Sequence, residues 1–201
     1  EARWRTNHSL HRNGDLYPTH GLGPVASMID INHGNRFLSL SSFSTKTKGL
    51  HDYIVKKGGA SHPNAKVEFK LGDIVTTHIK CANGETILLQ HDTNLPRPYS
   101  LGYRVQGTNG LWMQVNKGIY VEGVSLKHHE WDDQQSWLDK YDHPLWKRWA
   151  TKDNENAAGH GGIDFFVLHG FIEAVKRRVA PSMDVYDAAA WSAVTPLSEK
   201  S

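Results

Sequence analysis

The sequence predicts an α+β fold, with a largely antiparallel, open-faced sheet and helices packed on one face of it. The first observation is a series of hairpin turns at 82–84, 108–110 and 116–118, each containing Asn and Gly and each lying between short alternating segments. Asn and Gly tolerate the positive φ of tight turns, so the strands they join run antiparallel. The second observation is a C-terminal part with apolar residues at helical spacing. A sheet followed by helices gives an α+β arrangement of layers.

The first element follows a run rich in Gly and Pro, Asn13-Gly-Asp-Leu-Tyr-Pro-Thr-His-Gly-Leu-Gly-Pro24. Gly and Pro restrict the backbone to special conformations, so this run holds its polar side chains in a set direction. It also has the features of a helix start, with Thr19 as the expected N-cap. The residues expected on the buried face of that helix are Leu22, Val25, Ala26 and Ile29.

The middle of the chain reads as a succession of strands. Residues 36–44 alternate between apolar and polar, which is typical of a strand. Residues 49–65 contain three Gly and one Pro around a short expected helix at 52–57, and we interpret them as a surface excursion. The further strands expected are 66–70, 73–81, 85–91, 101–108, 111–115 and 119–124.

The tail is helical. The segment 134–150 has helical spacing but is interrupted at His143-Pro144, where proline lacks the N–H that a helix interior needs. The segment 162–178 ends in Lys176-Arg-Arg178, which suits the negative end of a helix dipole. Asp184 can cap a last helix that ends near Thr195-Pro196.

Length and composition place the chain among globular proteins. With 201 residues, 38% apolar and 22% charged, it fits one domain, and we expect a single domain over 1–201. The net charge of +2 is too small for a nucleic-acid-binding surface. The single Cys81 excludes an internal disulfide and is expected to be a buried structural thiol. No apolar stretch approaches the roughly 18 residues that span a bilayer.

Tyr17 and His20 are the candidate catalytic residues. They place a phenol and an imidazole three positions apart in the rigid run, and histidine exchanges protons near neutral pH. An active-site wall and an ordinary helix start are both compatible with this pattern. The other familiar catalytic patterns are absent: there is no G-x-G-x-x-G, no P-loop and no G-x-S-x-G. We predict no metal site at His128-His129-Glu130, because adjacent histidines on a strand point to opposite sides.

Two further polar segments allow more than one interpretation. Residues 90–99 interrupt the strands with two prolines and carry His91, Asp92, Arg97 and Tyr99. They form either a solvated connection or a ligand-facing loop with a tyrosine that stacks or hydrogen-bonds. His160-Gly-Gly162, with Asp164 soon after, permits a close approach of the backbone to another surface, but an ordinary helix start is favoured.

Seven motifs, in order along essentially the whole chain, resemble glycoside hydrolase family 109. They are Tyr17-Pro-Thr-His-Gly-Leu-Gly-Pro24, Gly72-Asp-Ile-Val-Thr-Thr77, His91-Asp-Thr-Asn-Leu-Pro-Arg-Pro-Tyr-Ser100, Val105-Gln-Gly-Thr-Asn-Gly110, Tyr141-Asp-His-Pro-Leu-Trp146, His160-Gly-Gly162 and Asp184-Val-Tyr-Asp-Ala188. Members of that family are NAD-dependent α-N-acetylgalactosaminidases built on the Gfo/Idh/MocA oxidoreductase plan. The resemblance covers the C-terminal half of this plan, and the N-terminal Rossmann domain that binds NAD is absent from this chain.

The resemblance implies a mechanism outside the two-carboxylate glycosidase scheme. NAD⁺ oxidises the sugar C3 hydroxyl, a base removes the C2 proton, and the group at C1 is eliminated. Water then adds and the ketone is reduced again, with retention, so NAD is recycled. The implied catalytic residues are His20, for acid/base chemistry, and Tyr17, which also touches the cofactor. The implied substrate-binding residues are Arg5, Tyr17, Pro18, Thr19, His20 and Tyr99.

The resemblance also implies a terminal α-linked N-acetylgalactosamine as substrate, with neither nucleic acid nor membrane as partner. We expect a homodimer or larger assembly through the sheet face, on account of the apolar residues Ile87, Leu89, Leu111, Met113, Ile119 and Val121. No signal peptide is present, but the chain starts at Glu1 without methionine, so we expect a fragment or a processed product. The family suggests either export or the cytoplasm. A sugar dehydrogenase of the same superfamily and a non-catalytic interaction module are the alternatives.

Overall fold

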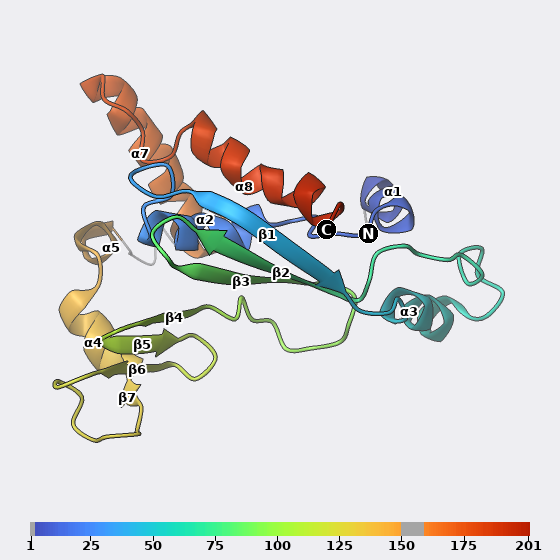
Figure 1. Cartoon of the computed structure of the whole chain (residues 1–201), viewed down its shortest axis with the longest axis horizontal. Helices are drawn as coiled ribbons and strands as arrows, with labels where there is room; N and C mark the ends of the chain where they lie inside the picture. Colours follow the sequence, from blue (N-terminus) through green and yellow to red (C-terminus); the bar gives the residue numbers. More distant parts are fainter. Residues whose placement is uncertain (1–2, 150–158) are drawn as a thin grey trace. The chain divides into compact units, whose positions relative to one another are not determined.

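A computed structural model describes residues 3–149 and 159–201 of the chain. These residues form two compact units. The first consists of residues 3–98 together with Met183–Ser201, and the second is drawn from Tyr99–Ser182. Each unit is built on its own antiparallel sheet, and each is described by itself below (Figure 1). The α+β class and the antiparallel pairing are therefore confirmed, but the expected single sheet is wrong: the described strands form two sheets.

The sheet of the first unit has the order β1-β2-β3, with β1 at Phe37–Ser44, β2 at Ile74–Cys81 and β3 at Thr86–Asp92. The hairpin between β2 and β3 turns at the expected Asn-Gly pair, where Gly84 has a φ of 102°. Such a φ favours glycine because a Cβ would clash with the backbone. The turn fixes the register that places Thr77 opposite Leu89 and Ile79 opposite Ile87.

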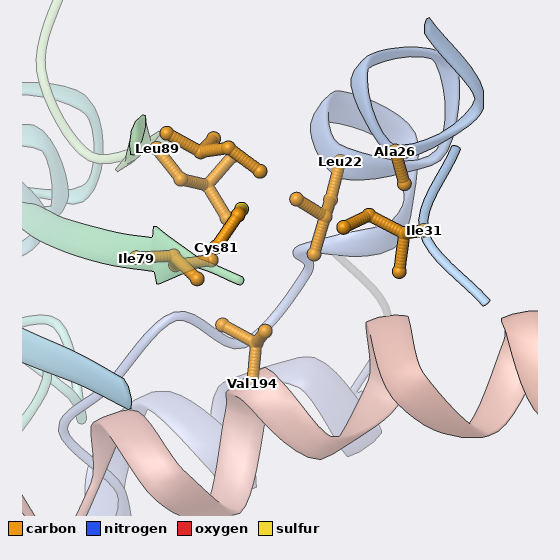
Figure 2. Close-up of a cluster of buried hydrophobic side chains, with 8 residues drawn as sticks. Leu22, Ala26, Ile31, Ile79, Cys81, Leu89 and Val194 are labelled. Carbon is orange, nitrogen blue, oxygen red and sulfur yellow. The ribbon is translucent and has the colours of Figure 1, made fainter. Parts of the chain in front are cut away.

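One face of this sheet is buried under two helices, α2 at Thr19–Met28 and α8 at Val185–Ser198. Figure 2 shows Leu22 and Ala26 of α2 and Val194 of α8 pointing toward Ile79 and Cys81 of β2. Alternate side chains of a strand point to opposite faces, so burial alternates along β2. Cys81 is a fully buried free thiol, as expected, and burial raises the pKa of that thiol.

The opposite face of the same sheet is exposed, and it differs from the expected apolar patch. Ile87 and Leu89 lie in the core on the covered face, so their place in an open patch is wrong. The exposed face carries Leu88 opposite His78 and Phe43 opposite Thr76. Successive residues of a strand point to opposite faces, so an error of one residue exchanges the two faces. The sequence of β3 alone does not show which of its faces the helices cover.

Two further helices complete the first unit. Helix α1 spans Arg3–His11 and α3 spans Gly49–Gly58. Helix α1 was not predicted from the sequence, and the strand expected at 66–70 is wrong. The reason is visible in the backbone bonds: the N–H groups of Lys70 and Leu71 both donate to the Ser9 carbonyl of α1 at 3.1 Å. N–H groups that donate to the Ser9 carbonyl are not available for hydrogen bonds to a neighbouring strand.

The second unit has a four-stranded sheet in the order β4-β5-β6-β7. Its strands are β4 at Arg104–Gly107, β5 at Gly110–Met113, β6 at Gly118–Val121 and β7 at Asp132–Asp133. Its helices are α4 at Gln134–Tyr141, α5 at Pro144–Trp149, the 3₁₀ turn η1 at His160–Gly162 and α7 at Ile163–Arg177. The break before Pro144 is where the sequence placed it, and the last residue expected in this helical segment, at position 150, lies outside the described residues.

The last helix, α8, begins as the sequence predicts but ends later. The Asp184 side chain accepts hydrogen bonds from the N–H groups of Tyr186 and Asp187, and Asp187 bonds back to Asp184 N–H, which forms a capping box. The helix continues through Pro196 to Ser198 rather than ending near Thr195. No helix among the described residues is long and apolar enough to cross a membrane.

Candidate active site

Tyr17 and His20 lie together at the start of α2. The Tyr17 Oη and His20 Nε2 atoms are 3.2 Å apart, within hydrogen-bond distance, and the two rings stack with centroids 4.5 Å apart. Both side chains are exposed, Tyr17 to 54%. A phenol and an imidazole that share one hydrogen bond can pass a proton to or from a bound molecule. The pairing that the three-residue spacing suggested is thus present in the structure.

The turn before this pair is fixed to distant parts of the first unit. The Asn13 side chain donates to Ser44 Oγ at 2.8 Å and accepts from Gly72 N–H at 3.0 Å. At Gly14 an added Cβ would lie 2.8 Å from Ser198 Oγ, so only glycine allows the backbone to come this close to the end of α8. The turn is therefore held from both β1 and α8.

Helix α2 starts without a side-chain cap. Pro18 occupies the N-cap position, with a φ of −70° and no capping hydrogen bond from its side chain. Thr19 is the first helical residue, so the expected Thr19 N-cap is wrong. Proline suits a helix start because its ring fixes φ near the helical value and its missing N–H would have no helical partner there. The expected apolar face of α2 is confirmed, because Leu22 and Ala26 are in the core and Val25 and Ile29 pack against it.

Asp15 is a site residue that the sequence analysis missed. It is only 1% exposed, and its Oδ1 accepts the Tyr17 N–H at 3.2 Å. Its Oδ2 is buried and has no hydrogen-bond partner in the described part of the chain. Removal from water disfavours the charged carboxylate and raises the pKa of Asp15 to about 6, although the Tyr17 N–H opposes this. The Asn-Gly-Asp spacing is a turn signal that could have identified it.

The raised pKa of Asp15 predicts a pH-dependent stability. In the folded protein Asp15 keeps its proton up to a pH of about 6, whereas the unfolded chain releases it near 3.8. The stabilising contribution is therefore full below a pH of about 4 and is lost as the pH rises through 6, by about 3 kcal/mol. We expect Asp15→Asn to remove this component, as measured by urea unfolding between pH 4 and 7. An unchanged pH dependence in Asp15→Asn would contradict the assignment.

The remaining expected substrate contacts lie in two different places. Arg5 belongs to α1, where its guanidinium packs 5.1 Å from the centre of the Trp4 ring. Tyr99 is the first residue of the second unit and is 88% exposed. The structure brings Tyr17, Pro18, Thr19 and His20 together at the start of α2. The participation of Arg5 and Tyr99 in the same site stays a prediction.

The segment 90–99 contains an ion pair rather than a solvated arginine. Arg97 Nε is 2.9 Å from Asp92 Oδ2, and an Arg97 amino group donates to the Asp92 carbonyl at 3.1 Å. His91 precedes this pair on the covered face of β3, opposite Val75. Burial lowers the pKa of His91, so its neutral form is favoured, while Asp92 opposes the shift. The ion pair closes a loop that ends just before Tyr99.

No group of three or more His, Cys, Asp or Glu side chains within residues 3–149 and 159–201 is placed to hold a metal ion. At the start of α7, His160 Nδ1 lies 3.0 Å from Asp164 Oδ1, and Gly161 and Gly162 have φ values of 67° and 93°. This arrangement is the ordinary helix start, which was favoured over a close approach of the backbone to another surface. For a nicotinamide cofactor, Tyr17 offers an exposed ring and a hydroxyl, which fit contact with a planar amide-bearing ring.

Comparison with known proteins gives one consistent family. The sequence profile described as "Glycosyl hydrolase 109, C-terminal domain" matches residues 1–201. A "Glycosyl hydrolase family 109 protein" of Stenotrophomonas maltophilia is 59% identical over 202 residues, which cover 100% of this chain and 44% of the relative. An "Alpha-N-acetylgalactosaminidase" of Tannerella forsythia is 59% identical over 201 residues, or 42% of that protein. A family 109 protein of a Shewanella species is 47% identical.

These relatives are all more than twice as long as the chain, which spans 42% to 44% of the first three. The profile match over the whole chain and the identity of its relatives agree with the seven motifs. The chain therefore belongs to the glycosyl hydrolase 109 family and corresponds to its C-terminal domain.

Proposed function

We propose that this chain is the substrate-binding part of a longer glycosidase that removes terminal α-linked N-acetylgalactosamine from glycoconjugates. The observation that carries the proposal is the exposed, hydrogen-bonded pair of Tyr17 and His20 in a chain of this family. The name of the Tannerella forsythia relative supports the choice of sugar. The proposed reaction proceeds by oxidation, elimination, addition and reduction, with retention at C1.

In the proposed site, His20 exchanges the proton at the sugar C2, because its imidazole is exposed and an imidazole can act as both base and acid. The Tyr17 hydroxyl bonds to the reacting C3 hydroxyl and shares its hydrogen bond with His20 Nε2. Pro18 and Thr19 join the two residues at the start of α2 and are further proposed substrate contacts, and Arg5 and Tyr99 orient the sugar. When bound, NAD supplies the reversible removal of hydride from C3.

The stoichiometry of the complete protein tests this function. With p-nitrophenyl α-N-acetylgalactosaminide and bound NAD, we expect many equivalents of nitrophenol and free sugar per enzyme, with no net NADH. Accumulation of NADH together with an oxidised sugar would instead identify a sugar dehydrogenase. A complete protein that produces neither nitrophenol nor NADH would favour the interaction module and contradict the proposal.

We propose that NAD is bound mainly by an N-terminal Rossmann domain of the longer protein, with Tyr17 as a contact from this chain. The chain contains no G-x-G-x-x-G fingerprint, the glycine turn that presents a helix N-terminus to the pyrophosphate of a dinucleotide. Calorimetric titration of residues 1–201 with NAD is therefore expected to give no measurable heat of binding. The complete protein is the positive control, and micromolar binding by residues 1–201 alone would refute this division.

We also propose that the protein forms a homodimer or larger assembly through the exposed face of the β1–β3 sheet. Phe43 and Leu88 support this proposal, because they are 74% and 65% exposed on that face. We expect Leu88→Glu to lower the molar mass that light scattering measures at micromolar concentration. Tyr53→Glu on α3 is the matched control for an added charge at an exposed residue. A monomeric wild type would contradict the assembly.

A further inference from the structure

The Tyr17–His20 pair needs an external support, because both side chains are exposed and burial of their rings contributes little to holding them. A group that transfers a proton must nevertheless be held in a narrow range of positions. The backbone that leads into α2 supplies such a support. Its first element is the bond from Tyr17 N–H to Asp15 Oδ1, at 3.2 Å.

Asp15 is unusual because it is a carboxyl group in the interior of the first unit. It is 1% exposed, and its second oxygen has no hydrogen-bond partner among the described residues. Burying such a group without full compensation costs free energy, and an apolar residue of similar size would avoid that cost. Packing alone therefore does not explain a carboxyl group at this position.

The backbone of Asp15 is in turn attached to the last turn of α8. Its N–H donates to Ser198 Oγ at 2.9 Å, and the same hydroxyl donates to the Thr195 carbonyl at 2.9 Å. A Cβ added at Gly14 would lie 2.8 Å from Ser198 Oγ, which is too close for a side chain at this position. A continuous chain of bonds thus runs from α8 through Ser198 and Asp15 to the Tyr17 backbone.

We propose that Asp15 is a positioning residue, which holds the Tyr17–His20 pair in its working direction by attaching the start of α2 to the end of α8. This inference rests on the proposed function in naming Tyr17 and His20 as the reacting pair. The acceptor oxygen is the essential feature, since it fixes Tyr17 N–H, and a neutral amide oxygen can accept the same bond.

The test uses the complete protein with Asp15→Ala and Asp15→Asn. We expect Asp15→Ala to lower kcat by roughly 10²-fold with a much smaller change in KM, because the pair is displaced rather than removed. Asp15→Asn is expected to recover most of the rate, because its amide oxygen can still accept from Tyr17 N–H. Wild-type kcat in Asp15→Ala, or equal losses in both variants, would overturn the inference.

Asp73 provides a matched control. It is also a buried carboxyl group at a helix start, where it accepts from the N–H groups of Lys48 and Gly49 at 2.9 Å before α3. Asp73→Ala should lower the melting temperature but leave kcat per folded molecule unchanged. The same kcat loss in Asp73→Ala would show a general effect of destabilisation and overturn the positioning role.

Two further measurements distinguish a loss of positioning from a failure to fold, and a failure of this inference from a failure of the proposed function. If Asp15→Ala does not fold, Ser198→Ala breaks the other end of the link: a lowered kcat supports the inference and a wild-type kcat overturns it. Crystals of the Asp15 variants need no activity. A displaced Tyr17–His20 pair in them supports the inference, and a wild-type arrangement overturns it, even where the complete protein cleaves no α-N-acetylgalactosaminide.

Discussion

Replacement of His20 by alanine in the complete protein is expected to lower kcat by roughly 10²–10⁴-fold, the usual contribution of a positioned acid/base group. The melting temperature should change little, because the imidazole is exposed and its contact with Tyr17 lies at the surface of the first unit. His51→Ala is a matched control, since His51 is an exposed histidine in the first turn of α3. Steady-state kinetics and thermal unfolding of both variants give the comparison.

The same measurements separate proton transfer from substrate orientation. Arg5→Ala and Tyr99→Phe should raise KM as well as lower kcat, because these residues are expected to bind the sugar rather than exchange its protons. A His20→Ala variant with near-normal kcat and a clearly lowered melting temperature would identify His20 as a structural residue. That result would remove the imidazole from the mechanism.

Replacement of Leu22 by alanine is expected to destabilise the first unit by about 2–5 kcal/mol. Leu22 of α2 is fully buried against α8 and the covered face of the sheet, so its replacement by alanine leaves a cavity. Met28→Ala on the same helix is the control, because Met28 is largely exposed and its loss leaves no cavity. Urea unfolding followed by circular dichroism measures both. Equal effects of the two substitutions would contradict the packing of α2 described here.

The parts of the fold that were predicted from the sequence are those set by local chemistry. The Asn-Gly turn at 83–84 gave the β2–β3 hairpin, and Asp184 gave the start of α8, because turn and cap residues act on their own neighbours. The strand expected at 66–70 is wrong because the N–H groups of Lys70 and of the next residue, Leu71, both donate to the Ser9 carbonyl, about 60 residues away in sequence. A short stretch of sequence around 66–70 carries no information about a hydrogen-bond partner so far away in the chain.

In the candidate site, too, the features set by neighbouring residues were predicted and those set by distant residues were not. Tyr17 and His20 were identified by their spacing in a rigid run, and they meet where the turn before Pro18 leads into the first turn of α2. Asp15 was missed because its burial depends on α8, whose Ser198 lies 183 residues further along the chain. The Thr19 cap was wrong because Pro18 itself occupies the N-cap position.

The proposed cleavage passes through removal of the sugar C2 proton by a group at the Tyr17–His20 pair. The most direct test is to run the complete enzyme in D₂O and to examine the released N-acetylgalactosamine by NMR. We expect deuterium at C2, because the exposed His20 imidazole exchanges its proton with solvent before returning one to the sugar. Released sugar that keeps its original C2 proton would contradict the account and indicate direct displacement at C1.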